Sequence, residues 1–310
     1  MILNTGSRTD IPAFYSTWFL NRIKAQSVLV RSPYAPNRLT RYRISPDVVD
    51  AICFCTKNPT PMLEHLNELS SFRQFWQVTV TPYGTDIEPN VPNKHELLDA
   101  VISLSELVGT ERVFWRYDPI FISEKYSLEY HLRAFNEMAS ILKGHVSSSV
   151  ISFIDLYDKT KRNFPQVREV NEQEIQQIGS AFSAIAKDNE MILRTCHEDH
   201  GLSRYGIDCS GCMTRKVLEQ ALQINLEVPS GASGARQGCR CLLSADIGAY
   251  NTCNHACRYC YANYDMDTVR RNLRKHDPDS ELLIGTVLPQ DEIVDAKQES
   301  WLSRRIHLEL

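Results

Sequence analysis

The first two-thirds of the chain alternates between two hydrophobic patterns, and this alternation limits the fold more than any other feature. Short runs rich in β-branched and aromatic residues, typical of strands, are separated by stretches with the apolar spacing of helices, about 3.6 residues. The predicted strands are 1–4, 27–31, 51–55, 75–81, 112–117, 150–155 and 191–196, and the predicted helices include 13–25, 61–69, 94–108, 128–142 and 172–187. This alternation predicts an α/β protein with a parallel sheet, and we expect a full or partial (β/α) barrel of the TIM type.

The composition of the chain indicates an ordinary globular protein. Of its 310 residues, 43% are hydrophobic and 23% are charged, and the formal net charge is −4. This charge gives no overall basic footprint for nucleic acid, and no apolar run approaches the length of about 20 residues that spans a membrane. The chain opens without the pattern of a signal peptide, so we expect a cytoplasmic protein without a membrane partner.

The cysteines are crowded into one part of the chain. There are 10, and eight of them lie between Cys196 and Cys260. In a reducing compartment such cysteines are more often metal ligands than disulfides. Cys253, Cys257 and Cys260 have the spacing C-x3-C-x2-C, which can bring three thiolates to three corners of an iron–sulfur cubane and leave the fourth iron open. Structural zinc and unliganded thiols are the alternatives.

This triplet, with Tyr259 directly before its third cysteine, resembles the cluster-binding motif of the radical S-adenosylmethionine enzymes. The resemblance implies a 4Fe–4S cluster whose open iron binds the amino and carboxylate groups of S-adenosylmethionine. An electron from a small donor such as a flavodoxin or a ferredoxin would then yield a 5′-deoxyadenosyl radical. The radical would abstract hydrogen from a substrate that the motif does not identify.

The position of the triplet departs from that family, because it follows the last predicted strand, 242–250, instead of the first. A circularly permuted barrel of the radical S-adenosylmethionine type reconciles the two, with 242–250 as the family's first strand and 1–4 as its second. The whole chain also resembles an uncharacterised bacterial family with a C-terminal triplet, through the phrases SRTDIPAFYS, CTKNP, FWRYDPI, ISFIDLY and DIGAYNTCNHACRYCYAN. CTKNP and the cysteine-rich loop are similar, over a short length, to spore photoproduct lyase.

A second set of cysteines precedes the triplet and contains two close pairs, a common way to assemble a four-thiolate site. Its members are Cys196, Cys209, Cys212, Cys239 and Cys241. The family resemblance implies an auxiliary site with Cys196, Cys212, Cys239 and Cys241 as ligands and Cys209 as a spare. Zinc and a second 4Fe–4S cluster are both compatible with it, and buried free thiols are the alternative.

Polar residues after the first predicted strand are candidates for binding S-adenosylmethionine. Gly6 permits close approach of the backbone, and Arg8 can form two hydrogen bonds to a carboxylate. Ser7 lies between them and is part of the same predicted cofactor site. Asp10 either accepts from ribose hydroxyls or caps the helix that begins near Pro12, and the two roles are compatible.

Further polar residues follow later strands, at the edge where barrel enzymes build their active sites. Arg116 and Asp118 flank Tyr117 on one face of a strand, and they contact substrate or simply pair with each other. A tyrosine near a radical can relay a hydrogen atom. The predicted catalytic residues are Lys57, Tyr117, Asp118 and Tyr157, and Asn58 and Arg116 join the predicted cofactor-binding residues.

These features divide the chain into four parts. Residues 1–200 are the main part of the barrel, 201–241 the cysteine-rich auxiliary site, 242–275 the last strand, the cluster loop and a helix, and 276–310 a C-terminal tail. Arg31, Arg38, Arg41 and Arg43 form a basic stretch, which is a solvated face or a phosphate contact. For Cys53 and Cys55 we expect core packing, and Cys55 is also a candidate for a hydrogen relay beside Tyr117 and Tyr157.

A protein of another class could carry the same cysteines. It would be a zinc- or Fe–S-stabilised binding protein, for nucleic acid for example, without radical chemistry. A metal-dependent hydrolase is a third hypothesis, but the cysteine-rich sites lack the histidine and carboxylate ligands that hydrolytic metals prefer.

Overall fold

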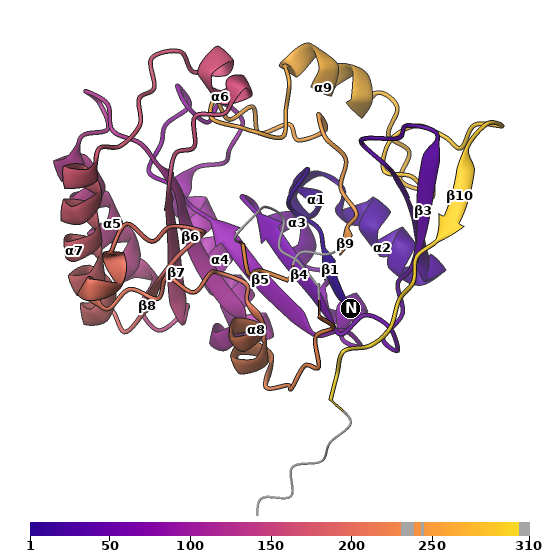
Figure 1. The fold of residues 1–310 in the computed structure, drawn as a ribbon, viewed down its shortest axis with the longest axis horizontal. Coiled ribbons are helices and arrows are strands. Elements are labelled where there is room, and N and C mark those ends of the chain that lie inside the picture. Colours follow the sequence, from indigo (N-terminus) through magenta and orange to yellow (C-terminus); the bar gives the residue numbers. More distant parts are fainter. Residues whose placement is uncertain (231–238, 243–244, 304–310) are drawn as a thin grey trace, which may run out of the picture.

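The computed structural model describes residues 1–230, 239–242 and 245–303, and it shows an α/β fold built on one large parallel sheet (Figure 1). The sheet has seven strands in the order β8-β7-β6-β5-β4-β1-β9, and every neighbouring pair is parallel. Its strands are β1 (Ile2–Asn4), β4 (Ala51–Thr56), β5 (Gln74–Thr79), β6 (Val113–Ile120), β7 (Ser148–Phe153), β8 (Ile192–Thr195) and β9 (Ala245–Asp246). The predicted α/β class and parallel sheet are confirmed.

The strands follow one another in chain order except at one edge of the sheet. β9, the last of them in sequence, pairs with β1, so that Leu3 lies opposite Ala245 and Asn4 opposite Asp246. β8 and β9 are the two edges of this open sheet, and closure into a barrel is not observed among the described residues. Within the described part of the predicted strand 242–250, only the two residues of β9 are in strand conformation.

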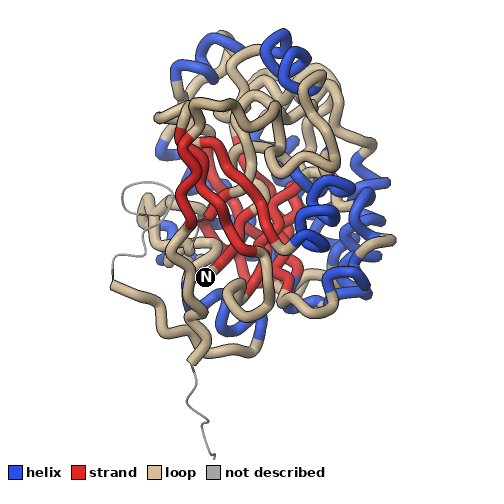
Figure 2. Tube along the Cα trace, turned by 90° about the vertical axis from the view of Figure 1, so that its right-hand side faces the viewer, coloured by secondary structure: helices blue, strands red, loops and turns tan. Residues whose placement is uncertain are grey.

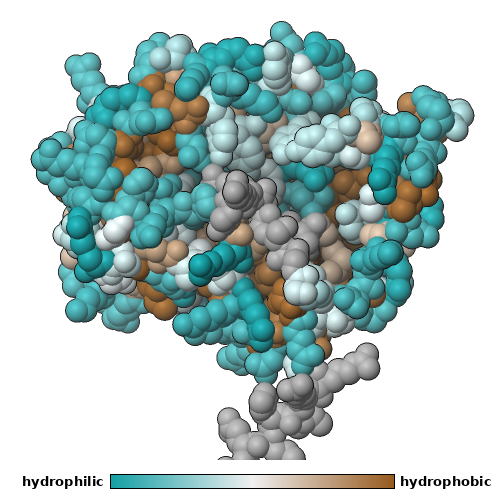
Figure 3. All heavy atoms as spheres, in the orientation of Figure 1, coloured by the Kyte–Doolittle hydropathy of each residue, from teal (hydrophilic) through white to brown (hydrophobic). Residues whose placement is uncertain are grey.

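Most of the helices lie on one side of the sheet, and loops gather on the other (Figure 2). The helices are α1 (Ile11–Phe14), α2 (Ser16–Ala25), α3 (Thr60–Leu63), α4 (Lys94–Val108), α5 (Leu128–Leu142), α6 (Asp158–Asn163), α7 (Glu172–Asp188), α8 (Arg215–Leu222) and α9 (Met266–Leu273). In the ranges that the structure describes, no helix combines the length and the apolar character needed to cross a membrane. The face of the molecule shown in Figure 3 is mostly hydrophilic, with apolar side chains visible in patches.

Stacked aromatic rings join the sheet to the helices. Trp115 of β6 stacks on Phe135 of α5 with 4.8 Å between ring centroids, and Phe135 stacks on Phe182 of α7 at 3.8 Å. Phe54 of β4 and Trp76 of β5 stack on each other at 4.0 Å. All five side chains are fully buried. Because side chains alternate along a strand, the residues between these aromatics face the opposite side of the sheet.

The three long helices begin where the sequence provides capping side chains. Asn93, Ser127 and Asn171 each accept a hydrogen bond from a backbone N–H in the first turn of α4, α5 and α7. At α7, Glu174 returns a contact to the backbone N–H of Asn171 and completes a capping box. These helices start at residues 94, 128 and 172, as the sequence predicts.

The predicted strand 27–31 does not belong to the large sheet. It forms β2 (Ser27–Arg31), which pairs antiparallel with β3 (Arg38–Arg43), and β3 pairs with β10 (Glu292–Asp295). The connection between β2 and β3 is short, so these two strands can pair with each other only in antiparallel fashion. A parallel pair would need a crossover of about a dozen residues or more. The tail 276–310 therefore contributes a strand of its own.

Three of the four arginines of this small sheet, Arg31, Arg41 and Arg43, have acidic partners. Arg31 pairs with Asp291 at 2.6 Å, and Arg43 pairs with Asp47 at 2.6 Å. Because these guanidinium groups already bind carboxylates, we interpret the basic stretch as a solvated face and not as a phosphate contact.

The predicted helix 13–25 is divided in two at Tyr15. The backbone of Tyr15 leaves the helical region, with φ −135°, so α1 ends before it and α2 begins after it. The Tyr15 hydroxyl donates to the carbonyl of Thr252 at 2.6 Å. This contact ties the start of α2 to the loop that carries the cysteine triplet. The predicted helix 61–69 is likewise interrupted, because α3 is followed by a separate 3₁₀ turn at Leu66–Leu69.

Candidate functional site

The triplet of Cys253, Cys257 and Cys260 lies in the loop that follows β9, at the carboxyl edge of the parallel sheet. The Cys260 N–H donates to the Cys257 carbonyl at 3.1 Å, so these two cysteines share one turn. The Tyr261 hydroxyl donates to the carbonyl of Ser7 at 2.7 Å. The triplet loop and the segment after β1 are therefore side by side, as their two strands are.

The three thiols of the triplet are close enough to influence one another's pKa. The pKa of Cys253 is raised by burial, by Asp10 and by the other two thiols. Burial raises the pKa of Cys257 to about 12 although Lys57 opposes the rise, and burial also raises the pKa of Cys260. Across the residues that the structure describes, no group of three or more His, Cys, Asp or Glu side chains converges so that it could hold a single metal ion.

The segment after β5 holds the triplet loop from another side. The Arg258 N–H donates to the Ile87 carbonyl at 3.0 Å. The backbone and side-chain N–H groups of Asn90 donate to the carbonyls of His255 and Asn254, at 3.2 and 2.7 Å. The loop is thus fixed between the segments that follow β1 and β5.

Glu88, in the same segment, is a fully buried carboxylate with four side-chain donors. Lys57 Nζ and Thr81 Oγ1 donate at 2.7 Å, and the Lys94 ammonium and the Tyr259 hydroxyl also donate to it. Burial alone would raise the pKa of Glu88, but the two ammonium groups outweigh it and hold the pKa at about 2. We call Lys57, Glu88 and Lys94 the Glu88 ion network. It links a predicted catalytic lysine to the aromatic residue of the triplet motif.

Asp10 is occupied by donors from the protein. It caps α1 through the Ala13 N–H at 3.1 Å, and it accepts from the Thr56 hydroxyl at 2.6 Å and the Lys57 N–H at 2.7 Å. His255 Nε2 lies 2.9 Å from its second carboxylate oxygen. The predicted helix cap is confirmed. With both oxygens engaged, Asp10 ties the triplet loop to α1 and β4, and a ribose contact is not supported.

The predicted cofactor residues after β1 lie against the end of β9. The Ser7 N–H donates to Asp246 Oδ2 at 2.9 Å, and Arg8 Nε lies 3.9 Å from Asp246 Oδ1. Burial raises the pKa of Asp246, and Arg8 opposes the rise. Gly6 packs on Cys55, where an added Cβ would lie 2.2 Å from the Cys55 carbonyl oxygen. Gly6 therefore permits close approach to the neighbouring strand.

Replacing Gly6 by alanine should lower the free energy of unfolding by about 1–3 kcal/mol, the usual cost of an extra methyl group in packed structure. The methyl group would meet the backbone of Cys55, which cannot move aside as a side chain can. Urea denaturation followed by circular dichroism measures the loss. Gly84→Ala is the control, because its methyl group would first meet the Asp86 carboxylate, at 2.9 Å. Equal losses in the two variants would contradict the prediction.

Arg116 and Asp118 face away from the helices and pair with each other. The Arg116 guanidinium also donates to Gln77 Oε1 at 2.5 Å and to Cys212 Sγ at 3.3 Å. The Ser152 hydroxyl donates to Asp118. The pairing of Arg116 with Asp118, which the sequence left open as one of two alternatives, is therefore present. Arg116 also connects the strand ends to the second set of cysteines.

Tyr117 lies on the opposite side of β6, which corrects its predicted role as a hydrogen relay. Its ring is fully buried against α5 and α7, 5.3 Å from Phe135 and 5.5 Å from Phe182. Its hydroxyl lies 2.8 Å from His131 Nδ1, and His131 Nε2 lies 2.9 Å from the Phe121 carbonyl. Since a carbonyl only accepts, Nε2 carries the proton and Nδ1 accepts from the tyrosine.

This buried, neutral histidine predicts a loss of stability in mild acid. Burial lowers the pKa of His131 to about 4, from about 6.5 in an unfolded chain. Between these values the unfolded chain binds a proton that the folded chain does not, so the free energy of unfolding falls as the pH is lowered, by up to about 3 kcal/mol. Urea denaturation at several pH values measures this loss. In His131→Gln it should be smaller, and an unchanged pH dependence would contradict the prediction.

Tyr157 and Asn58, two further predicted site residues, have different contacts. Tyr157 is 45% exposed, and its ring lies 6.3 Å from that of Tyr261, next to the triplet. Asn58 uses its side-chain oxygen to accept from the Thr60 N–H at 3.1 Å, at the start of α3. Tyr157 therefore stays near the triplet, whereas the side-chain oxygen of Asn58 belongs to a turn.

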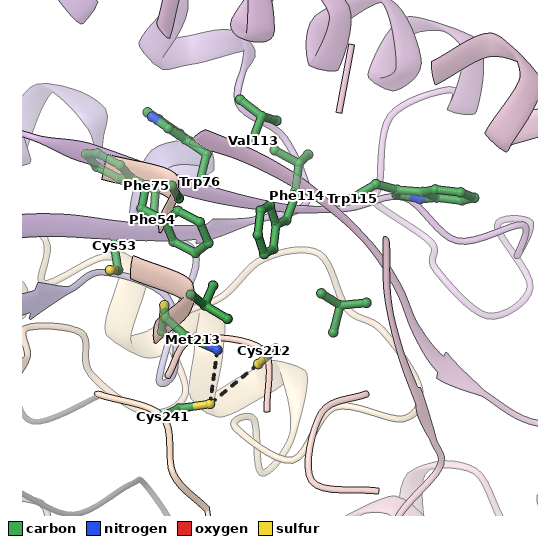
Figure 4. Close-up of a cluster of buried hydrophobic side chains, with 14 of the residues drawn as sticks. Cys53, Phe54, Phe75, Trp76, Val113, Phe114, Trp115, Cys212, Met213 and Cys241 are labelled. Carbon is green, nitrogen blue, oxygen red and sulfur yellow. Dashed lines mark hydrogen bonds between the residues drawn. The ribbon is translucent and has the colours of Figure 1, made fainter. Parts of the chain in front are cut away.

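Two cysteines of the second set, Cys212 and Cys241, lie together beside Cys53 and the aromatic side chains of the sheet (Figure 4). Cys212 Sγ lies 3.7 Å from Cys241 Sγ, and the Met213 N–H donates to Cys241 Sγ at 3.3 Å. The neighbouring Cys196 and Cys241 lower the pKa of Cys212, and the neighbouring Cys212 and Cys239 raise the pKa of Cys241. Cys209 is directed to the Ile207 carbonyl, at 3.7 Å.

Cys53 and Cys55 lie beneath this group. They are two residues apart on β4, so both face the same side of the sheet. Cys53 is fully buried, which confirms core packing. Burial raises the pKa of its thiol, and the nearby Cys55 and Cys212 thiols raise it further. Burial raises the pKa of Cys55 to about 12, against the opposing charge of Arg116. The cysteine-rich segment thus packs on the centre of the sheet.

The sequence did not single out four residues that organise the site, Glu88, Lys94, Asp246 and His255. Asp246 ends an apolar strand at the carboxyl edge, and His255 lies inside the triplet motif, so both carried a local signal. Glu88 and Lys94 sit in an ordinary loop and at a helix start, where nothing in the sequence marks them.

Together these elements define an α/β protein with an open parallel sheet and a cysteine triplet at its carboxyl edge. The chain belongs to the family described as a domain of unknown function, DUF1848, whose model matches residues 2–262. The matched range contains both sets of cysteines, and the predicted membership of an uncharacterised domain family is confirmed. Neither the curated proteins nor the solved structures that were searched gave a match.

Proposed function

We propose that this protein is an iron–sulfur enzyme of the radical S-adenosylmethionine type, built on a circularly permuted partial barrel. The observation that carries the proposal is the pairing of β9 with β1 at the edge of the sheet. A chain with the same sheet that began at β9 would run through β1, β4, β5, β6, β7 and β8 in order, with the triplet after its first strand. The family resemblance implies this arrangement.

The residues around the triplet suit an iron–sulfur cluster. Its three thiols are close enough to influence one another's pKa, as the ligands of a single cluster must be. Burial raises the pKa of both Cys257 and Cys260, and Lys57 opposes this rise in the direction of the thiolate form that a metal needs. When bound, a reduced 4Fe–4S cluster would supply the electron that cleaves S-adenosylmethionine.

We assign the carboxylate of S-adenosylmethionine to Arg8. Its Nε is only loosely paired, 3.9 Å from Asp246, and its guanidinium lies 5.9 Å from the centre of the Tyr250 ring. The substrate would lie toward Lys57 and Asp118, because Lys57 interacts electrostatically with both Cys257 and Asp118. Tyr157, next to the triplet, remains the candidate for a hydrogen relay.

We also propose an auxiliary metal site, zinc or 4Fe–4S, at Cys196, Cys212, Cys239 and Cys241. The contact of 3.7 Å between the Cys212 and Cys241 sulfurs supports it, as do the effects of Cys196 and Cys239 on the pKa of these two thiols. The hydrogen bond from Arg116 to Cys212 Sγ is of the kind that orients and tunes a metal ligand.

The proposed reaction needs an electron from a small donor protein, such as a flavodoxin or a ferredoxin. Two groups of cysteines that suit metal ligation are typical of a reducing compartment, and we propose the cytoplasm. The fold hosts many chemistries and does not by itself define the substrate.

A zinc-stabilised protein that binds nucleic acid is the second candidate, and one observation favours it. Exposed basic residues border the triplet loop on α6 and around α9: Lys161, Arg162, Arg258, Arg270, Arg271, Arg274 and Lys275. Basic groups near exposed aromatic rings such as Tyr261 and Tyr264 are typical of single-strand binding.

Anaerobic reconstitution with ferrous iron and sulfide, followed by metal analysis and visible absorption, separates the two candidates. The iron–sulfur enzyme should bind about four iron atoms per chain at the triplet, or about eight if the auxiliary site also takes a cluster. A colourless protein that retains zinc at its cysteines and takes up no iron would support the second candidate instead.

A further inference from the structure

The Glu88 ion network carries an unbalanced positive charge inside the protein. The side chain of Glu88 is fully buried, and those of Lys57 and Lys94 are only 13% and 21% exposed. Lys57 Nζ lies 2.7 Å from one carboxylate oxygen, and Lys94 binds the other. Two ammonium groups against one carboxylate leave one positive charge, and a poorly hydrated charge without a counter-charge is costly.

The cysteines of the triplet would supply that counter-charge as thiolates when they bind a cluster. Lys57 Nζ lies 5.6 Å from the centre of the ring of Tyr259, the residue directly before Cys260 in the triplet motif. Asp118 also interacts with Lys57, but it already pairs with Arg116. The ammonium of Lys57 therefore faces the triplet with its charge only partly compensated.

The network is also fixed in position relative to the triplet. The Tyr259 hydroxyl, from within the triplet motif, donates to Glu88. Hydrogen bonds from Arg258 and Asn90 hold the same loop against the segment that carries Glu88. The charge of Lys57 is thus held next to Cys257 by the fold.

We propose that the Glu88 ion network raises the reduction potential of the cluster bound by Cys253, Cys257 and Cys260. This inference rests on the proposed function, because it requires that cluster. Reduction adds one electron from an external donor to the cluster and needs no change in its bonds or protons. A fixed positive charge in a poorly hydrated site stabilises the more negative, reduced state, so Lys57 acts through its charge and Glu88 positions it.

Redox titration of the anaerobically reconstituted full chain with dithionite, followed by electron paramagnetic resonance, tests the proposal. Lys57→Met removes one positive charge and should shift the midpoint potential to a more negative value. Glu88→Gln removes one negative charge and should shift it to a more positive value. The double variant has the net charge of the original network, so its midpoint should fall between those of the two single variants. Structural damage alone would not produce shifts of opposite sign.

Lys125→Met is the matched control. Lys125 pairs with Asp86 at 2.9 Å, two residues before Glu88, but both of these side chains are exposed. Water and salt screen such a charge, so this variant should keep the original midpoint. Where Lys57→Met binds no iron, Lys94→Gln removes the same charge from the other carboxylate oxygen and should give the same negative shift.

The possible failures can be told apart. Single variants with full iron content and unchanged midpoints, or with midpoints shifted in the same direction, overturn this proposal and leave the proposed function intact. Failure of both lysine variants to bind iron would indicate a purely structural role and would also overturn it. If the unaltered protein takes up no iron and sulfide, the proposed function fails, and this inference fails with it.

Discussion

Replacing Cys257 by alanine is expected to remove the iron–sulfur cluster and to reduce the formation of 5′-deoxyadenosine to background. A three-cysteine site has no spare protein ligand, so the loss of one thiolate leaves two of the four irons without one. The fold should remain, because Cys257 lies in the loop after β9, outside every described helix and strand. Iron analysis and visible absorption measure the loss of the cluster, and circular dichroism measures whether the fold remains.

Cys209→Ala is the matched control for the loss of a thiol. Cys209 lies in the same cysteine-rich half of the chain, but its thiol is directed to the Ile207 carbonyl, apart from the other cysteines of its set. This variant should keep its iron content and its product formation. A Cys257→Ala protein with as much iron as the control would contradict the assignment of the triplet.

Replacing Glu88 by alanine is expected to lower the free energy of unfolding by about 3–5 kcal/mol, the range found when one partner of a buried ion pair is removed. Lys57 and Lys94 would keep their buried positions without the carboxylate that both of them contact. Urea denaturation of the metal-free protein near neutral pH, followed by circular dichroism, measures the loss.

Glu68→Ala is the control for this variant, since Glu68 pairs with Lys24 at 2.9 Å on the protein surface. Such pairs contribute at most about 1 kcal/mol. Acid gives a second check, because the pKa of Glu88 is held at about 2, below its unfolded value of about 4.3. The stability that Glu88 contributes is complete above that unfolded value and is lost as the pH falls toward 2. The difference between the original protein and Glu88→Ala should therefore shrink over this range, and a difference that grows would contradict the prediction.

Most of the large sheet could be predicted from the sequence, because its central strands are buried on both faces and appear as apolar runs. The predicted strand 51–55 ends one residue before β4 ends, and the predicted strand 191–196 extends one residue beyond β8 at both ends. The strand 27–31 was placed in the wrong sheet, because a strand pattern does not identify the partner of a strand. β9 has only two residues, too few to show any periodicity, and its bounds could not be predicted.

The candidate site divides in the same way between local and distant signals. The triplet could be recognised because its spacing lies within eight consecutive residues of the printed sequence. The Glu88 ion network could not, because Lys57, Glu88 and Lys94 meet only through the order of the strands. Tyr117 could have been excluded from the sequence, since the alternation that places Arg116 and Asp118 on one face places Tyr117 on the other.

The most direct test of radical chemistry at the triplet is an assay of 5′-deoxyadenosine formed from S-adenosylmethionine by the reconstituted protein. We predict formation that requires both the cluster and a reductant, and that is absent in Cys257→Ala. A protein with a full, dithionite-reduced cluster that forms no 5′-deoxyadenosine, and whose electron paramagnetic resonance signal does not change when S-adenosylmethionine is added, would contradict the proposed function.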